Sequence, residues 1–280
     1  MALAALWALP VAAKPVWTFP GTLAVFAQRL HAACPILSHN ASLSLPSASI
    51  IKLVILVGIV RQIDAGHLRW SSELQIRGPE IVGASESFGQ VVPGTRATVR
   101  RLADAMVAQS DNTAGNVFAD HLSFAGVNAV AASLHLNQTR IRRHFMDFAA
   151  RARGIDNTTS AADMGRLLLG VERGARGMPS PVATARSCRE IVMMMLEQED
   201  RDTIPAGVHR HVSIANKTGV LNDVRNDAAI IDPFGRDPYV LVLLSRFAPS
   251  QTRRAYARLQ ALASAVDALE QSDARVRAAF

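Results

Sequence analysis

Hydrophobic residues recur along this chain with two different periods, and the period changes near Pro205. Before Pro205, apolar residues mostly recur three and four positions apart, which is typical of amphipathic helices. Thr22–Ala33 shows this spacing, and the apolar run Ile50–Val60 is too long for a typical strand, so both segments predict helices. The second of these should be buried and should end near Ala65-Gly66. The other predicted helices are Val99–Val107, Thr113–Phe118, Ala161–Val171, Ala185–Leu196 and Arg253–Leu269.

Three short runs after Pro205 predict β-strands, namely Val212–Thr218, Asp227–Ile231 and Tyr239–Ser245, because turn residues separate them. Helices on either side of these strands predict a mixed α/β fold, in which an antiparallel sheet is flanked by N- and C-terminal helices. The helical middle of the chain would then be an inserted all-helical domain. We therefore expect a sheet domain formed by residues 1–48 and 205–280, and a helical domain formed by residues 49–204.

Composition excludes several classes of protein. The 280 residues are 49% hydrophobic and 19% charged, which excludes a disordered chain and provides for a large core. Two cysteines, Cys34 and Cys188, are too few for a disulfide scaffold or a four-cysteine zinc site. One bridge between them and two free thiols both remain open. The histidines form no set with metal-ligand spacing, so we expect neither a metal nor another cofactor.

Charge and hydropathy limit the partners. The net charge of +7 is densest at residues 140–144, but no nucleic-acid-binding signature accompanies it, so we expect a solvated basic face and no nucleic-acid partner. A small anionic substrate would suit this charge. We expect the protein to be a monomer.

No run of the sequence reaches the ~18 apolar residues that a membrane span needs. Ala2–Ala13 is similar to the apolar region of a signal peptide, which predicts export to the periplasm or the medium. The alternative is an ordinary alanine-rich helix in a cytoplasmic protein.

Ser49 and Lys52 form the first candidate for chemistry. Ser49 opens the predicted buried helix, where backbone N–H groups and the helix dipole favour developing negative charge. Lys52 follows one turn later on the same face. Burial within an apolar run favours the neutral amine, which can accept a proton from a serine hydroxyl. Since Ser-x-x-Lys is common by chance, the alternative is a helix-capping serine and a lysine that reaches solvent.

Two further motifs carry polar groups suited to acyl transfer. Ser110-Asp111-Asn112 lies in the break between two predicted helices, where Ser110 could relay a proton and Asn112 could donate to a substrate amide. Simple helix capping would explain the same residues. Lys217-Thr218-Gly219 ends the first predicted strand, where a cation and a hydroxyl would hold a substrate carboxylate and glycine would let the substrate approach closely. The alternative is a strand end with a turn glycine.

Taken together, the three motifs at 49, 110 and 217 resemble the class A β-lactamase and penicillin-recognising serine hydrolase family. Ile63–Gly66, Ser110–Asn116, Asp156–Thr159 and Asn216–Gly219 are also similar to family segments. The resemblance runs from about Ser47 to the C-terminal helix. It implies an active site in the cleft between the two domains and a covalent acyl-enzyme formed with a β-lactam or a related acyl substrate.

By position, the resemblance also implies a role for each candidate residue. Ser49 would be acylated, Lys52 would be its base or proton relay, and Ser110 would pass a proton to the leaving nitrogen. The substrate-binding groups would be the Asn112 amide for the acylamide side chain, Lys217, Thr218 and Gly219 around the carboxylate, and the backbone N–H groups of Ser49 and Val220 as the oxyanion hole.

The chain departs from the family at the residue that activates the deacylating water. Efficient class A enzymes carry a glutamate there, in a Glu-x-x-Leu-Asn loop, whereas this chain has Phe145 and no following Leu-Asn. Phenylalanine cannot act as a base, so we expect slow deacylation. Asp147 is the first candidate for a substitute base and His144 the second, since either could poise a water. Asp147 could instead be an ion-pair partner of the neighbouring arginines.

A second departure is N-terminal. Only the 15 residues Cys34–Ala48 separate the first predicted helix from Ser49. This length is short for the two-strand hairpin of the family, so one strand should be shortened or missing.

The function predicted overall is that of a serine hydrolase acylated at Ser49. The alternatives are a penicillin-binding sensor or trap without turnover, and an esterase or amidase that acts on a non-antibiotic substrate.

Overall fold

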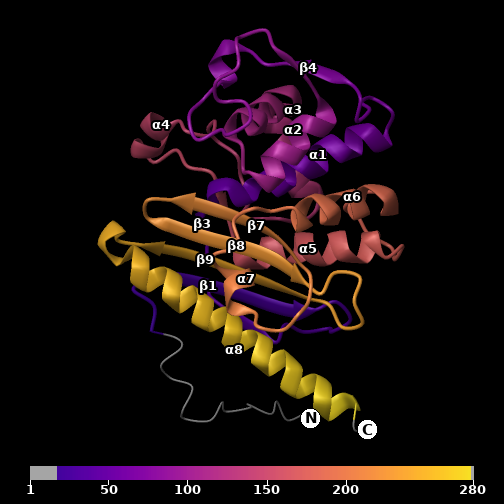
Figure 1. Ribbon diagram of the computed structural model, residues 1–280, viewed down its shortest axis with the longest axis vertical. Coiled ribbons are helices and arrows are strands. Elements are labelled where there is room, and N and C mark those ends of the chain that lie inside the picture. The colour runs from indigo at the N-terminus through magenta and orange to yellow at the C-terminus, as the bar shows by residue number, and fades with distance from the viewer. Residues whose placement is uncertain (1–17, 279–280) are drawn as a thin grey trace.

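A five-stranded antiparallel sheet lies at the centre of the computed structural model, which describes residues 18–278 (Figure 1). The strand order is β2-β1-β9-β8-β7. Helices α5 and α6 cover one face of the sheet, and the long helix α8 crosses the other (Figure 1). This arrangement confirms the mixed α/β fold. The elements are β1 (Gly21–Arg29), β2 (Leu37–His39), β7 (Ile214–Leu221), β8 (Val224–Ile231), β9 (Tyr239–Phe247), α5 (Ala161–Ala175), α6 (Ala185–Leu196), α7 (Ile204–Gly207) and α8 (Thr252–Ala278).

Strand β1 corrects the prediction of a helix over Thr22–Ala33. It pairs with β2 on one side and β9 on the other, and its residues alternate between two hydrophobic cores. Ala24 and Phe26 enter the core shared with α5, whereas Leu23 and Val25 enter the core beneath α8. Because both faces are buried, the apolar run does not alternate with polar residues and is easily mistaken for a helical face.

The hairpin before Ser49 does not follow the predicted helix as expected, because its first strand is β1 itself, and of the hairpin only β2, with three residues, lies within Cys34–Ala48. Its partner β1 is complete, with nine. Cys34 lies exposed between these strands, and Cys188 is buried on α6, so both are free thiols.

The upper half of the molecule in Figure 1 is mainly helical and is built around one buried helix. That helix is α1 (Lys52–Asp64), entered through the short 3-10 helix η2 (Ala48–Ile51), and it confirms the helix predicted from the run Ile50–Val60. Helices α2 (Val99–Ala108) and α3 (Asn112–Ser133, kinked at Ser123) pack against it. The remaining elements are α4 (Phe148–Ala152), β3 (Leu45–Pro46), β4 (Glu73–Gln75), β5 (Arg96–Thr98), β6 (Thr158–Thr159), η3 (Gly78–Glu80) and, at the start of α8, η4 (Pro249–Gln251).

The segment 49–204 therefore differs from a purely helical insertion. It contains the short strands β4, β5 and β6, and its helix α5 packs directly on the sheet, where the Phe26 ring lies against Gly165. The predicted signal-like stretch Ala2–Ala13 lies outside the described residues. Within residues 18–278, no helix combines the length and the apolar character that crossing a membrane requires.

Candidate active site

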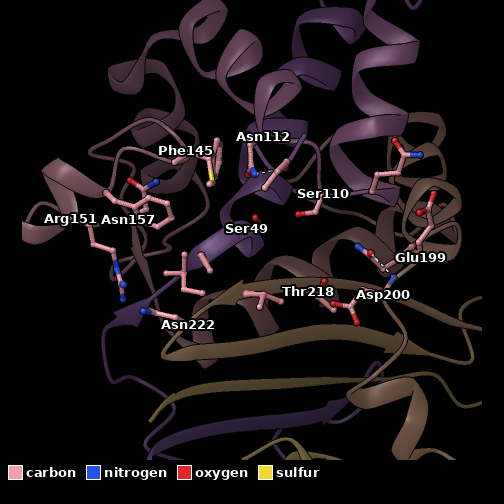
Figure 2. A pocket seen from close by; sticks show the side chains of 18 of the residues that line it. Ser49, Ser110, Asn112, Phe145, Arg151, Asn157, Glu199, Asp200, Thr218 and Asn222 are labelled. Carbon is pink, nitrogen blue, oxygen red and sulfur yellow. Dashed lines mark hydrogen bonds between the residues drawn. The ribbon is translucent and has the colours of Figure 1, made fainter. Parts of the chain in front are cut away.

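A cavity of about 810 Å³ opens between the helical half and the edge of the sheet at β7 (Figure 2). The structure brings together along its walls Ser49, Ser110, Asn112, Thr218 and Val220, although these residues are far apart in the sequence. Lys52 and Lys217 have no exposed surface. The three sequence motifs thus meet in one place, as the resemblance implies.

A close approach of β7 to η2 positions Ser49. Ala48, directly before it, has a left-handed backbone with φ 45°, an uncommon conformation for a residue with a side chain. A Cβ atom added to Gly219 would lie 2.9 Å from the Ser47 carbonyl oxygen and 3.1 Å from the Ser49 nitrogen. Glycine is therefore needed at 219 because the strand backbone passes so near η2. Ser49 and Val220, which belong to these two elements, both line the cavity.

Lys52 connects α1 to the junction of α2 and α3. Its Nζ donates to Asn112 Oδ1 at 2.8 Å, to Ser110 Oγ at 3.3 Å and to the Ser110 carbonyl oxygen. Among the described residues, none of its hydrogen bonds goes to Ser49. Burial holds the pKa of Lys52 well below its usual value, and the nearby charge of Lys217 lowers it further, whereas Asp111 opposes this shift. The environment therefore favours a neutral amine.

Asp111 fixes the conformation of this junction. Its buried carboxylate accepts from the backbone nitrogen of Ala114 at 2.8 Å and from those of Ser87 and Phe88 at 3.0 Å each. It thereby caps α3 and ties the preceding loop to it. The adjacent Ser110 has a left-handed backbone with φ 59°, a costly conformation that persists where the surroundings determine it. For Asp111, the helix-capping alternative predicted from the sequence is therefore confirmed.

Lys217 lies beneath the opposite wall of the cavity. Its Nζ donates to the Thr218 carbonyl oxygen at 3.0 Å. Burial lowers the pKa of Lys217 to about 7, although Asp227 and Asp200 partly oppose the shift. Asp227 lies opposite Thr218 in the β7–β8 ladder, and burial raises the pKa of its carboxyl to about 6.

Asp200 is a cavity residue that sequence analysis missed. It lines the wall beside Thr218, and its carboxylate accepts from Arg225 Nη1 at 2.6 Å and Nη2 at 2.7 Å. A hydrogen bond from Thr218 and the Arg225 charge help to lower its pKa against the effect of burial. The only sequence signal for this network was a pair of charges, Arg225 and Asp227, at the start of a run that is otherwise apolar.

The Phe145 side chain lies directly beside Lys52. Its ring centroid is 4.6 Å from Lys52 Nζ, and a Cβ atom on Gly115 would lie 2.8 Å from the ring. The side chain of Asn116 holds the loop, since its Oδ1 accepts from the Phe145 backbone nitrogen at 2.8 Å. Figure 2 shows Phe145 on the cavity wall above Ser49. Hydrocarbon, rather than a carboxylate, therefore covers this side of Lys52.

Neither candidate for a substitute base lines the cavity. Asp147 is exposed and caps α4, where its Oδ1 accepts from the Ala150 backbone nitrogen at 2.8 Å. The Nε2 atom of His144 lies 2.5 Å from Asp120 Oδ1. The expectation that Asp147 or His144 replaces the missing glutamate therefore has no support from the geometry. Asp147 is also not the ion-pair partner of the local arginines among the described residues, because Arg143 and Arg151 pair with Asp156.

The two ends of the cavity differ in charge. Figure 2 shows Glu199 and Asp200 on one side of Ser49, and Arg151, Asn157 and Asn222 on the other. Within residues 18–278, no group of three or more histidine, cysteine, aspartate or glutamate side chains is arranged to hold a metal ion. The arrangement offers a serine hydroxyl, a neutral amine, hydroxyl relays and backbone donors, which are the parts of nucleophilic acyl transfer.

The chain is similar in sequence or in fold to several known proteins. A β-lactamase of Kitasatospora aureofaciens is 26% identical over 224 residues, which cover 74% of this chain and 68% of that protein. Among solved structures, that of PBP-A has a TM-score of 0.83 at 24% identity and covers 92% of this chain and 94% of the other. A β-lactamase from Sphaerobacter thermophilus has a TM-score of 0.77 at 22% identity, with 92% of each chain covered. At these identities the structures show the shared fold.

The family assignment rests on the sequence match. The model of the β-lactamase enzyme family matches residues 14–269, which is most of the chain and includes all three motifs. This protein belongs to the β-lactamase enzyme family.

Proposed function

We propose that this protein is a serine hydrolase that is acylated at Ser49 by a β-lactam or a related acyl substrate and then deacylates slowly. The observation that carries the proposal is the contact between Phe145 and Lys52, with 4.6 Å between the ring centroid and Nζ. Ser49, Ser110, Asn112 and Thr218 line the cavity, where acylation would take place. Among the described residues, the Phe145 ring covers Lys52, and the nearby Asp111 carboxylate is engaged by three backbone N–H groups, so neither is placed to activate a water for deacylation.

Acylation would begin with attack of Ser49 Oγ on the substrate carbonyl carbon. The hydroxyl proton passes to the neutral Lys52 amine, which burial favours. The backbone N–H groups of Ser49 and Val220 stabilise the oxyanion, and each such donor is typically worth roughly 3–4 kcal/mol. The carbon–nitrogen bond then breaks. Ser110, which hydrogen-bonds Lys52 at 3.3 Å, delivers the proton to the leaving nitrogen.

Substrate binding would use the two remaining motifs. Asn112 holds Lys52 through its Oδ1 and the Ala84 carbonyl oxygen through its Nδ2, at 2.8 and 2.7 Å, which leaves one amide N–H for the acylamide group. Lys217 and Thr218 would hold the substrate carboxylate, and Gly219 keeps that strand close to Ser49.

Hydrolysis of the acyl-enzyme would be the slow step. Water needs a base that accepts its proton, and such help is typically worth about 10²–10⁴-fold in rate. The acyl-enzyme should therefore accumulate during turnover. The structure of a PBP-A mutant, with a TM-score of 0.81 to this chain at 24% identity, is an acyl-enzyme complex with penicillin G, which supports the formation of an acyl-enzyme on this fold.

Intact-mass spectrometry over time tests this proposal. Penicillin G should add its full mass to the protein, peptide mapping should place it on Ser49, and the adduct should disappear slowly with release of hydrolysed product. The variant Ser49→Ala should form no adduct and should stay folded, because the Ser49 side chain caps no helix. An adduct on another residue would contradict the assignment of Ser49, and an adduct that never clears would favour the penicillin-trapping alternative.

One observation favours a second candidate, an esterase or amidase. The Asp200 carboxylate lies next to Thr218, where the substrate carboxylate would bind, and like charges oppose one another. Second-order acylation rates for penicillins, cephalosporins and simple uncharged esters separate the candidates. Faster reaction with the uncharged esters would favour this second function.

A further inference from the structure

The active-site cavity shares a wall with a second cavity. The second cavity measures about 520 Å³ and lies between β3, α4 and the turn that joins β7 to β8. Phe148 and Arg151, both on α4, line this cavity and the active-site cavity as well. These two side chains therefore form the partition between the two spaces.

An ion pair holds this partition to the sheet. Arg151 Nη2 donates to Asp223 Oδ1 at 2.7 Å and to Oδ2 at 3.0 Å, and Asp223 lies in the β7–β8 turn. Arg151 Nε also donates to Asp156 Oδ2 at 3.0 Å, within the loop that follows α4. The Arg151 and Asp223 side chains are only 18% and 17% exposed. Arg151 thus ties α4 to the sheet edge across the end of the active-site cavity.

The orientation of a bound substrate decides which part of it meets this wall. Figure 2 shows Thr218 and Asp200 on one side of Ser49, and Arg151 on the opposite side. In the proposed function the substrate carboxylate faces Thr218. With the reacting carbonyl at Ser49, the acyl side chain must therefore extend toward Arg151.

We propose that the Arg151–Asp223 ion pair is a gate for the acyl side chain, and that the second cavity is a subsite for long, polar acyl side chains. The inference rests on the proposed acylation at Ser49. The second cavity offers hydroxyl, carboxylate and guanidinium groups from Ser44, Thr158, Asp156 and Arg246. This lining fits a peptide-like chain with amide groups better than an aliphatic one. With the gate closed, compact acyl side chains are preferred.

The test compares acylation rates for two penicillins, penicillin G and a derivative whose acyl side chain is lengthened by a dipeptide. Asp223→Asn removes the charge that holds Arg151 to the β7–β8 turn, while Asp156 still holds Arg151 within its own loop. It also weakens the 3.5 Å ion pair between Asp223 and Arg246, which lines the second cavity. It should raise the rate constant for the long penicillin about fivefold, the factor expected from one partly exposed ion pair, and leave that for penicillin G unchanged. Asp223→Glu keeps a carboxylate and should retain the original ratio. Glu73→Gln is the matched control, since it makes the same charge change at an exposed ion pair with Arg96.

A second variant tests the destination of the long side chain. Ser44→Trp, made together with Asp223→Asn, places a large side chain at a lining position of the second cavity and should cancel the fivefold gain. An unchanged ratio in Asp223→Asn, equal changes for both penicillins, or a gain that survives Ser44→Trp would each overturn the gate and its subsite. Failure of the proposed function looks different, because then no penicillin would form an adduct with the unmodified protein.

Discussion

At the scale of single residues, the side chain at position 145 determines what Lys52 faces. Phe145 is only 5% exposed, and its ring packs against both Lys52 and Gly115. The Asn116 side chain holds this loop through hydrogen bonds to the backbone nitrogen and oxygen of Phe145. The Phe145 side chain can therefore be replaced without loss of those hydrogen bonds. A carboxylate introduced at this position would lie near the Lys52 amine.

Phe145→Glu should therefore shorten the lifetime of the penicillin adduct, by about a hundredfold if the carboxylate acts as a general base. Stopped-flow measurement of the burst and the following linear phase gives both rate constants. Phe145→Leu, which keeps an apolar side chain, is the matched control and should leave the adduct lifetime unchanged. If Phe145→Glu and Phe145→Leu deacylate equally slowly, the missing base is not what limits hydrolysis.

Lys217 should give acylation a distinctive pH dependence. Burial lowers its pKa to about 7, so its positive charge is lost as the pH rises above that value. Acylation by carboxylate-bearing β-lactams should then fall by about tenfold per pH unit on the alkaline side. Esters without a carboxylate should keep their rate there. Both substrate classes should lose rate at low pH, where Lys52 becomes protonated. Parallel alkaline profiles for the two classes would show that Lys217 is not the carboxylate anchor.

At the scale of elements, the packing of strand β7 on η2 sets the geometry around Ser49. Gly219 allows this contact, because a Cβ atom there would lie 3.1 Å from both Ala48 Cβ and the Ser49 nitrogen. The two proposed oxyanion donors, on Ser49 and Val220, belong to these two elements. Their separation therefore depends on how closely β7 and η2 approach each other.

Gly219→Ala should move β7 away from η2 and slow acylation by about a hundredfold, the typical cost of losing one oxyanion donor. Gly126→Ala on α3 is the control, since the nearest atom to the added methyl lies at 3.5 Å. Thermal denaturation should show both variants folded at the assay temperature. Normal acylation in Gly219→Ala would exclude the Ser49–Val220 pair as the oxyanion hole.

Elements also differ in how well the sequence predicts them. Helix α1 could be predicted because its apolar run, Ile50–Val60, is longer than a typical strand and because Ala65-Gly66 marks the end of the helix. Strand β1 could not, because burial on both faces removes the alternation that identifies a strand. The motif residues of the site could be recognised because each motif is a short run of residues close together in the sequence. Asp200, Arg151 and Asp223 were not, since their roles arise from contacts between segments distant in the sequence.

At the scale of the whole molecule, two separate cores lie on the two faces of the sheet. The proposed catalytic side chains belong to the half that contains α1, whereas α8 covers the other core. A buried ion pair joins α8 to the sheet, with Arg29 Nε 2.5 Å from Glu270 Oε2 and side chains 10% and 6% exposed. Mutations on the face of the sheet that α8 covers should therefore change stability without changing catalysis.

Arg29→Met should lower the free energy of unfolding by about 3–5 kcal/mol, because it leaves a charged Glu270 buried. Urea denaturation measures this change. Arg96→Met, which breaks an exposed pair with Glu73, should cost less than about 1 kcal/mol. The acylation rate per folded molecule should be unchanged in both. A small effect of Arg29→Met would show that the Arg29–Glu270 ion pair contributes little to holding α8 on the sheet.

The packing of Phe145 against Lys52 also has an evolutionary consequence. Phenylalanine and glutamate codons differ at every position, so no single nucleotide change introduces the base. The residues that one change can reach from phenylalanine all lack a carboxylate. Each of them would disturb a buried ring that already fills its space and would gain no carboxylate in exchange. A lineage with this loop would therefore be expected to keep acylating its substrates for a long time before it could evolve to release them quickly.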